Sequence, residues 1–388
     1  MRIIVALSLV LIMLGPVIAC GTETSPKQAP STTATPIPAS PATSATAPTS
    51  NLSLPTAQDA AWQNIVEAAK KEGKLTDYSF NFTGDIGIAI SRAFKERYGI
   101  QLEIVTGRGA DFIERVKTER RMGSLMVDMS DGSAPNMAIM KNEGLTVSIA
   151  GELPEVREKD VWIADIMAMD PKDGHLITYT FTRYSPFVNT NLVKPGEEPK
   201  VWKDFLDPKW KGKMTLIDPI LSSGPYQQFV PMMREKVIDA EFLKALYKQD
   251  LLFVGAQLDQ VRAITKGDRA MAIQANNSSF GQFLAEGAPI RAINLTDGTP
   301  VTSTVLSAYK GAPHPNTARV FINWLISQEG QSVWGKAAGV ANARKDVPSF
   351  APEALRYTPT RPVIVTNEDN DEAARLYQER FLNKLWGR

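Results

Sequence analysis

The stretch KLTDYSFNFTGDIGIAISRAFKERYGIQLEIVTGRG, residues 74–109, decides the fold class of this chain. Residues 74–80 are typical of a strand, and apolar side chains then recur over residues 86–94 at the spacing of one helix face. Gly99 follows where that helix would end, and residues 101–105 are again typical of a strand. A strand, a helix and a strand in succession predict parallel strands joined by a crossover helix.

The alternation of helix and strand continues on both sides of this stretch. Before it, apolar residues at helical spacing from Trp62 to Ala69 predict a helix that ends at Gly73. After it, residues 112–116 mark another helix and residues 125–129 mark a third strand. Three repeats of this alternation predict a mostly parallel sheet covered by helices.

A second α/β unit begins after about residue 180. Its segments show the same exchange between strand-like runs and helical spacing. Two units fit the length of the chain, since 388 residues are enough for two domains with separate cores. The strands expected here are residues 177–181, 187–188, 214–217, 251–254 and 270–274, and the helices expected are residues 202–206, 241–247, 258–265, 321–325 and 374–385.

The composition excludes several classes of function. The formal net charge is +1 and no run of basic residues is present, so nucleic acid is not an expected partner. Cys20 is the single cysteine, and His175 and His314 are the two histidines, so a zinc site of the usual kind cannot be assembled. The chain also has no G-x-S-x-G, HExxH or P-loop motif. We therefore expect a binding protein and not an enzyme.

The beginning of the chain predicts its compartment. Arg2 precedes an apolar run over residues 3–14, which is typical of a signal peptide and too short to span a bilayer. Cys20, preceded by a small residue, resembles the lipidated cysteine of a bacterial lipobox; an ordinary secretory signal with a chance cysteine is the alternative. We expect a signal peptide over residues 1–19 and an extracytoplasmic protein held to the cell membrane through lipid on Cys20.

Residues 20–58 connect this anchor to the folded part of the chain. Thr, Pro, Ser and Ala dominate the segment, and Glu23 and Lys27 are its only charged residues up to residue 55. A segment of this composition cannot bury enough apolar area to offset the entropy that it would lose on ordering. We expect a disordered tether.

Candidate ligand-binding residues follow the predicted strands. Ligands of open α/β sheets bind at the carboxyl ends of strands, where loops and helix N-termini meet. Arg108, between two glycines, suits a carboxylate or a phosphate, with a solvated loop arginine as the alternative. The ring of Tyr226 suits either stacking on a ligand or capping its loop. The predicted site combines Arg108, Ser133, Tyr184, Ser223, Gly224, Tyr226, Asn276 and Asn277, although an asparagine pair is also common in turns.

Six segments in a fixed order give the chain a resemblance to a known family. The segments are residues 67–75, 107–121, 188–193, 202–212, 310–316 and 321–331. The ordered set covers nearly all of the chain from about residue 59 to residue 350. It resembles the extracellular solute-binding proteins of ABC transporters, family 1, in the ferric-type branch with the type II periplasmic-binding fold.

The resemblance implies an α/β protein with a two-lobed, periplasmic-binding-protein-like II fold, in which each lobe is a mixed, mostly parallel sheet flanked by helices. Crossing strands would form the hinge. Lobe 1 would comprise residues 59–180 and about 292–315, and lobe 2 would comprise residues 181–291 and about 316–388.

The resemblance also implies partners. A small solute would close the lobes and pass to a membrane permease that is driven by an ATPase, and the protein is expected to be a monomer. A lipoprotein that senses the solute without transporting it is the alternative.

Two classes of ligand stay open at this point. Ferric-binding members hold iron through tyrosine phenolates, typically an adjacent pair, because Fe³⁺ prefers hard oxygen ligands. No two tyrosines are adjacent here, and Tyr184 and Tyr226 are the only ones in candidate loops. We expect a polar or anionic solute and no cofactor, with Fe³⁺ held by these two tyrosines as the alternative.

Overall fold

The computed structural model describes residues 57–107, 109–276, 280–281, 283–284, 286–356 and 359–387. The predicted signal peptide, Cys20 and nearly all of the predicted tether lie outside these residues. The described residues belong to one compact unit. Within the described ranges, no helix is long and apolar enough to cross a membrane.

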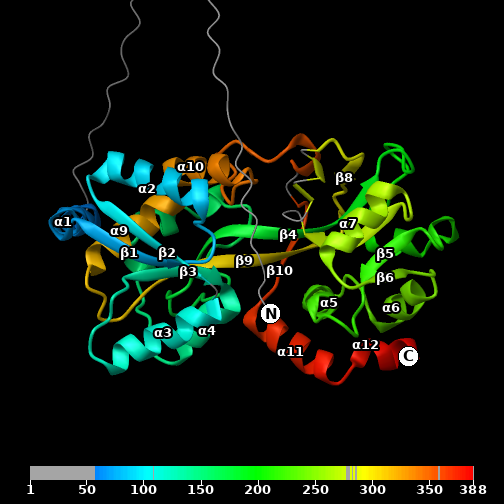
Figure 1. Cartoon of the computed structure of the whole chain (residues 1–388), viewed down its shortest axis with the longest axis horizontal. Helices are drawn as coiled ribbons and strands as arrows, with labels where there is room; N and C mark the ends of the chain where they lie inside the picture. Colours follow the sequence, from blue (N-terminus) through cyan, green and yellow to red (C-terminus); the bar gives the residue numbers. More distant parts are fainter. Residues whose placement is uncertain are drawn as a thin grey trace, which may run out of the picture. The chain divides into compact units, whose positions relative to one another are not determined.

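Ten strands of the described residues form one sheet (Figure 1). They follow the order β2-β1-β3-β9-β4-β7-β5-β6, while β10 pairs with β9 and β8 pairs with β4. This mixed α/β sheet with helices on its faces confirms the fold class predicted from the sequence. The strands are β1 (Lys74–Ser79), β2 (Gln101–Thr106), β3 (Met129–Ser133), β4 (Ile177–Asn189), β5 (Met214–Ile217), β6 (Leu252–Val254), β7 (Met271–Asn276), β8 (Ile290–Ala292), β9 (Thr299–Ala308) and β10 (Pro362–Ile364).

Two sets of parallel strands are joined by two long antiparallel strands. The first strand set is β1 with β2 and β3 beside it, and the second strand set is β5 with β6 and β7 beside it. The crossing strands, β4 and β9, connect these sets: β4 pairs with β9 through residues 177–183 and with β7 through residues 184–188. The lobe boundary expected at residues 180–181 lies within β4.

The strand directions turn the carboxyl ends of the two sets toward each other. Both β3 and β4 are antiparallel to β9, so the first strand set runs in the same direction as β4. Because β7 is antiparallel to β4, the second strand set runs in the opposite direction. The loops that follow both sets therefore lie toward the middle of the sheet, beside the crossing strands.

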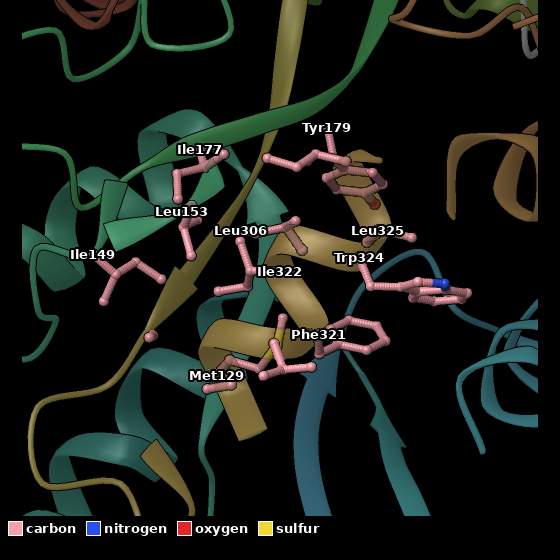
Figure 2. Close-up of a cluster of buried hydrophobic side chains, with 14 of the residues drawn as sticks. Met129, Ile149, Leu153, Ile177, Tyr179, Leu306, Phe321, Ile322, Trp324 and Leu325 are labelled. Atoms are coloured by element: carbon pink, nitrogen blue, oxygen red, sulfur yellow. The ribbon is translucent and has the colours of Figure 1, made fainter. Parts of the chain in front are cut away.

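Each strand set has its own buried side chains on both faces. Tyr179 of β4 and Phe321 belong to a large cluster that covers one face of the first strand set (Figure 2). A cluster that contains Phe112 covers the other face. The second strand set is enclosed in the same way by a cluster that contains Trp202 and by one that contains Phe187. The two sets thus have separate cores and share the crossing strands.

Helices cover both sets. Gly99 and Gly267 end α2 and α7 with φ of +74° and +85°, the left-handed region that favours glycine, so the helix end predicted at Gly99 is confirmed. The helices are α1 (Ala57–Glu72), α2 (Gly84–Tyr98), α3 (Gly109–Arg121), α4 (Ala134–Asn142), α5 (Gly224–Arg234), α6 (Ala240–Tyr247), α7 (Gln257–Lys266), α9 (Pro315–Ile326), α10 (Gln328–Ala338), α11 (Asn367–Gln378) and α12 (Phe381–Trp386), with 3-10 turns η1 (Ala150–Glu152), η2 (Pro154–Arg157), η3 (Lys159–Val161), η4 (Trp202–Leu206), η5 (Pro208–Trp210) and η6 (Glu353–Leu355).

α9 and α10 pack with the first strand set, which differs from the expected assignment of residues 316–388 to lobe 2. Phe321 and Trp324 of α9 lie with their ring centroids 5.0 and 5.4 Å from that of Phe94 on α2. α10 also packs against α2. α11 and α12 do pack with the second strand set, where Leu376 is buried. The division into two lobes stays a prediction, with α9 and α10 on the side of the first strand set.

β3 lies further along the chain than the sequence predicted. The expected strand was residues 125–129, whereas β3 spans Met129–Ser133. Gly132 and Ser133 are extended because they pair with Val305 and Thr304 of β9. Glycine and serine are poor strand formers, so only the distant partner strand reveals this pairing.

Candidate functional site

Loops from both strand sets lie beside the crossing strands, and most of them lead into a helix. Residues 80–83, Gly107 and the start of α4 follow the first strand set. Residues 218–223, residues 255–256 and the end of β7 follow the second. Backbone N–H groups at a helix start can donate to an anionic or polar ligand. These strand-end loops form the candidate ligand-binding site.

Asp131 on β3 fixes the loop that follows β1. Its carboxylate accepts hydrogen bonds from the N–H groups of Phe80 at 3.1 Å and Asn81 at 3.2 Å. The side chains of Ser79, Asn81 (2.9 Å) and Tyr179 (3.0 Å) donate to the same carboxylate. Burial raises the pKa of Asp131, and these side-chain hydrogen bonds oppose the rise. The first strand-end loop is thereby tied to β3 and to the crossing strand β4.

Asp77 on β1 is a second buried carboxyl group on the same strand set. Its carboxyl oxygens have no hydrogen-bond partner among the described residues. Burial raises the pKa of Asp77 well above its ordinary value, and the nearby charge of Asp131 raises it further. Asp131 accepts several hydrogen bonds that stabilise a carboxylate, so of the two groups Asp77 is the one whose pKa lies further above its ordinary value.

Asp218 and Ser222 shape the loop between β5 and α5. The carboxylate of Asp218 accepts a hydrogen bond from the N–H of Ile220 at 2.8 Å, and its carbonyl accepts one from the N–H of Ser222 at 3.1 Å. The hydroxyl of Ser222 accepts from the N–H of Gly224, the first residue of α5, at 3.1 Å. The predicted residues Ser223 and Gly224 are half-buried at this helix start, where Ser223 is the N-cap residue.

Gln257 links the start of α7 to the end of β7. Its side-chain oxygen accepts a hydrogen bond from the N–H of Asn276 at 3.1 Å, and its amide donates to the carbonyl of Gln274 at 3.4 Å. In the register of β4 and β7, Asn276 stands opposite Tyr184. Two of the predicted site residues, Asn276 and Tyr184, are thus neighbours, and Asn277 lies outside the described residues.

The two tyrosines that the sequence offered as iron ligands lie in different surroundings. Tyr184 is half-buried on β4, and burial raises the pKa of its phenol while a hydrogen bond with Thr302 lowers it. Tyr226 is 1% exposed and packs edge-on against Tyr377 of α11, with ring centroids 5.6 Å apart. Burial raises the pKa of Tyr226 as well. Its packing makes Tyr226 a core residue and disfavours one of its two predicted roles, stacking on a ligand.

The two remaining predicted residues follow the first strand set. Ser133 is the last residue of β3 and the N-cap residue of α4, and its side chain is exposed. Arg108 lies outside the described residues, directly after Gly107. The structure places Ser133 and Asn276 at strand ends, Tyr184 on a crossing strand, and Ser223 and Gly224 at the start of α5. Their role in binding a ligand stays a prediction.

Sequence reasoning missed the apolar side chains of the strand-end loops. Phe80 after β1 is 54% exposed, Leu221 after β5 is 65% exposed, and Leu258 at the start of α7 is 43% exposed. All three stand in strand-end loops or at the helix start that follows one, where a bound ligand or partner would cover them. The sequence did carry a signal for them, because each stands at or shortly after the end of a predicted strand.

The described residues contain no group of three or more His, Cys, Asp and Glu side chains that could hold a metal ion. Both histidines have structural partners instead. His314 Nδ1 lies 3.0 Å from the carboxylate of Asp128, and His175 Nδ1 lies 2.8 Å from the hydroxyl of Thr146. The strand-end loops therefore offer hydroxyl, amide and backbone N–H groups, which suit a polar solute.

Comparison with known proteins gives a match over most of the folded part. Residues 89–360 match the sequence model of the family described as bacterial extracellular solute-binding protein. A relative from Haemophilus influenzae, described as an uncharacterized protein, is 24% identical over 347 residues, which are 87% of this chain and 96% of the relative.

Solved structures share the fold. The Trichodesmium protein IdiA (FutA), in complex with iron and citrate ligands, has a TM-score of 0.63 at 19% identity and covers 81% of this chain and 99% of its own. The periplasmic binding protein AfuA from Actinobacillus pleuropneumoniae, with fructose-6-phosphate bound, has a TM-score of 0.54 at 17% identity and covers 79% of this chain and 97% of its own. At these identities the likeness concerns the fold alone.

Proposed function

The chain belongs to the bacterial extracellular solute-binding proteins, the substrate-binding proteins of ABC importers, and we propose that it captures a small polar or anionic organic solute while anchored to the cell membrane through lipid on Cys20. The permease and the ATPase of the importer are its expected partners. The protein is expected to act as a monomer that binds and releases the solute without chemical change.

The observation that carries this proposal is the opposition of the two strand sets across β4 and β9. A solute that contacts loops from both sets binds more tightly when the sets are close together than when they are apart. Such a ligand shifts the protein toward the closed arrangement, to an extent set by the difference between its affinities for the closed and the open arrangement. The separate cores of the two sets support a relative motion of this kind.

Polar groups for the solute are available from each side. Ser133 and Arg108 would contribute from the first strand set, and Ser223, Gly224 and Asn276 from the second, together with Asn277. Tyr184 would contribute from the crossing strand beside Asn276. Tyr226 would support the loop before α5 from within the core.

The exposed apolar side chains favour an organic solute. Phe80 belongs to the first strand set, whereas Leu221 and Leu258 belong to the second. A solute with a carbon skeleton would cover apolar area from both sides, at roughly 25 cal/mol for each Å² that it buries. A bare metal ion would leave this area in water.

Fe³⁺ is the second candidate ligand because the Trichodesmium protein of the same fold is described with iron and citrate. The positions of the tyrosines argue against it, since Tyr226 lies in the core and Tyr184 stands on the crossing strand. A lipoprotein that senses the solute without transporting it would use the same loops.

A thermal-shift screen tests the proposal. Sugars, sugar phosphates, carboxylates, polyamines and Fe³⁺ would be added separately to the purified protein. A ligand present at 100 times its dissociation constant stabilises the fold by about 2.7 kcal/mol. Stabilisation by an organic compound, lost when Ser223 and Asn276 are both replaced by alanine, would support the proposed site. Stabilisation by Fe³⁺ alone would replace it with the iron alternative.

A further inference from the structure

Gln274 on β7 is buried without a partner for its side-chain amide. The residue is 2% exposed, and within the described ranges neither Oε1 nor Nε2 forms a hydrogen bond. In the unfolded chain both atoms form hydrogen bonds with water, so their burial lowers the stability of the fold. Buried polar groups of folded proteins are nearly always paired, and the exceptions often have a functional cause.

The backbone of Gln274 is strained as well. Its φ is +56°, in the left-handed region that favours glycine. The register of β4 and β7 explains this angle, because Pro186 of β4 alone lies opposite both Ile273 and Gln274. The result is a β-bulge, a feature that often lies beside a functional site and redirects a side chain. Strain of this kind is typical of positions that serve function at the expense of stability.

Gln274 stands near the carboxyl end of the second strand set, where two parallel strands separate. β5 pairs with β7 through Met214 and Thr215, which lie opposite Met271 and Ala272. The last two residues of β5 pair with β6 instead. Gln274 therefore lies just beyond the point of separation, and ligands of open α/β sheets bind in the crevice at such strand ends.

The residues next to Gln274 belong to the candidate ligand-binding site or adjoin it. Gln257 at the start of α7 donates its amide to the carbonyl of Gln274 at 3.4 Å. Two residues further along β7, Asn276 stands opposite Tyr184. Ser185 follows on the crossing strand, and its buried hydroxyl also has no hydrogen-bond partner in the part of the chain that the structure describes. These side chains supply amides and hydroxyls and no charge.

On the basis of the proposed function, we propose that Gln274 binds adjacent hydroxyl groups of a sugar-like solute. A carboxamide has one oxygen that accepts and one nitrogen that donates. Each hydroxyl group of a solute can both donate and accept, so two adjacent hydroxyls can pair with both ends of the amide. The neutral side chains next to Gln274 suit a neutral group, whereas a carboxylate or an ammonium would be buried there without a counter-charge.

Gln274 also links the presence of the solute to closure of the two strand sets. Its amide is enclosed in the arrangement described here, so a solute reaches it when the strand-end loops are apart. In an open arrangement water can pair with the amide, whereas in the closed arrangement only the solute supplies partners. The unpaired amide thus disfavours closure of the empty protein, and the bound solute removes this penalty.

Urea unfolding and calorimetry of the variant Gln274→Met test the inference. Methionine keeps the length of the side chain and removes both polar atoms. We expect the urea midpoint to rise and the affinity for a sugar to fall at least about fivefold, since a hydrogen-bonded contact with the solute is lost. D-glucose, D-galactose and fructose-6-phosphate would serve as probes with hydroxyl groups, and spermidine and succinate as probes without them.

Gln260→Met is the matched control. Gln260 on α7 is fully buried like Gln274, but its amide nitrogen donates to the carbonyls of Thr215 at 3.2 Å and Ile273 at 3.0 Å. The same replacement should therefore lower the urea midpoint at this position. Gln274→Asn is a second variant, because asparagine keeps the carboxamide and tolerates the left-handed backbone. We expect it to bind the sugar more tightly than Gln274→Met does.

A urea midpoint that falls in Gln274→Met as it does in Gln260→Met would overturn the inference, because the amide would then have partners in the fold. An unchanged sugar affinity in Gln274→Met would overturn it as well. Binding of spermidine or succinate without binding of any hydroxyl-bearing probe would exclude the sugar-like solute and leave the proposed function intact. If no organic compound of the thermal-shift screen binds the wild type, the proposed function is wrong together with the role of Gln274.

Discussion

Burial and the nearby carboxylate of Asp131 on β3 together raise the pKa of Asp77 on the neighbouring strand β1, and both side chains are buried. Asp131 accepts hydrogen bonds from three side chains and two backbone N–H groups, and it fixes the loop that begins at Phe80. Asp77 makes no such contacts within the described residues. Asp131 therefore fixes a strand-end loop, whereas Asp77 should lower the stability of the fold at neutral pH.

Replacement of Asp77 by asparagine should stabilise the protein at neutral pH. The folded state binds the proton of Asp77 more tightly than the unfolded state, because its pKa is raised above 3.8 in the fold. Asp77 therefore contributes most to the free energy of unfolding when the pH is below its ordinary pKa. This contribution is lost as the pH rises through the pKa of Asp77 in the folded protein, by up to about 1.4 kcal/mol per pH unit. Asparagine removes this loss.

Urea unfolding of both proteins between pH 4 and pH 8 measures the effect. We expect the stability difference in favour of Asp77→Asn to grow as the pH rises. A difference that stays constant across this range, or one that favours the aspartate at neutral pH, would show that Asp77 is ionised in the fold. Asp173→Asn is a useful control, since Asp173 is exposed and its pKa is lowered by Lys141, which predicts the opposite sign.

The sequence predicts the elements that local pattern determines. The strand at residues 74–79, the helix that ends before Gly99 and the next strand all form where apolar spacing and a glycine stop indicate them. Phe321 and Trp324 show the limit of this reasoning. Their spacing predicts a buried helix face, but which core they enter depends on Phe94, far away in the chain.

Some positions in the candidate site follow from the local sequence, whereas others depend on residues that are distant in the chain. The rule that ligands bind at the carboxyl ends of strands selects Ser133, Ser223 and Asn276 from the sequence alone. Tyr226 sits only two residues into α5, so its position along the chain does not distinguish a ligand contact from a core contact. Its partner Tyr377 decides the question, and no local pattern links the two.

Tyr226→Ala should destabilise the fold. Removal of a fully buried aromatic ring leaves a cavity and costs about 3–5 kcal/mol. Urea unfolding would detect this loss, whereas Tyr226→Phe keeps the packing against Tyr377 and should stay within about 1.5 kcal/mol of the wild type. If the Tyr226→Ala protein had unchanged stability, the ring of Tyr226 would not be packed in the core of the wild type. Tyr226 would then again be a candidate ligand contact.

Cys20→Ser should abolish lipid attachment. A serine cannot form the thioether that holds the diacylglycerol, so cells fed labelled palmitate should incorporate label into the wild type and not into the variant. Thr22→Ala, two residues further along the tether, is the control and should keep the label. Absence of label from the wild type as well would leave an ordinary secretory signal as the explanation of the apolar run.

Phe80→Ser and Leu221→Ser should weaken solute capture while leaving the fold intact. Both side chains are more than half exposed, at 54% and 65%, so their loss should change the stability by less than about 0.5 kcal/mol. If closure covers them with the carbon skeleton of the solute, each replacement should cost up to about 1.5–3 kcal/mol of binding free energy. Calorimetry with the compound found in the thermal-shift screen would measure this. Met122→Ser, at a 73% exposed residue between α3 and β3, tests whether any exposed apolar residue has the same effect. Unchanged affinity in the Phe80 and Leu221 variants would mean that the solute does not contact these loops. Apolar contacts would then no longer support an organic ligand.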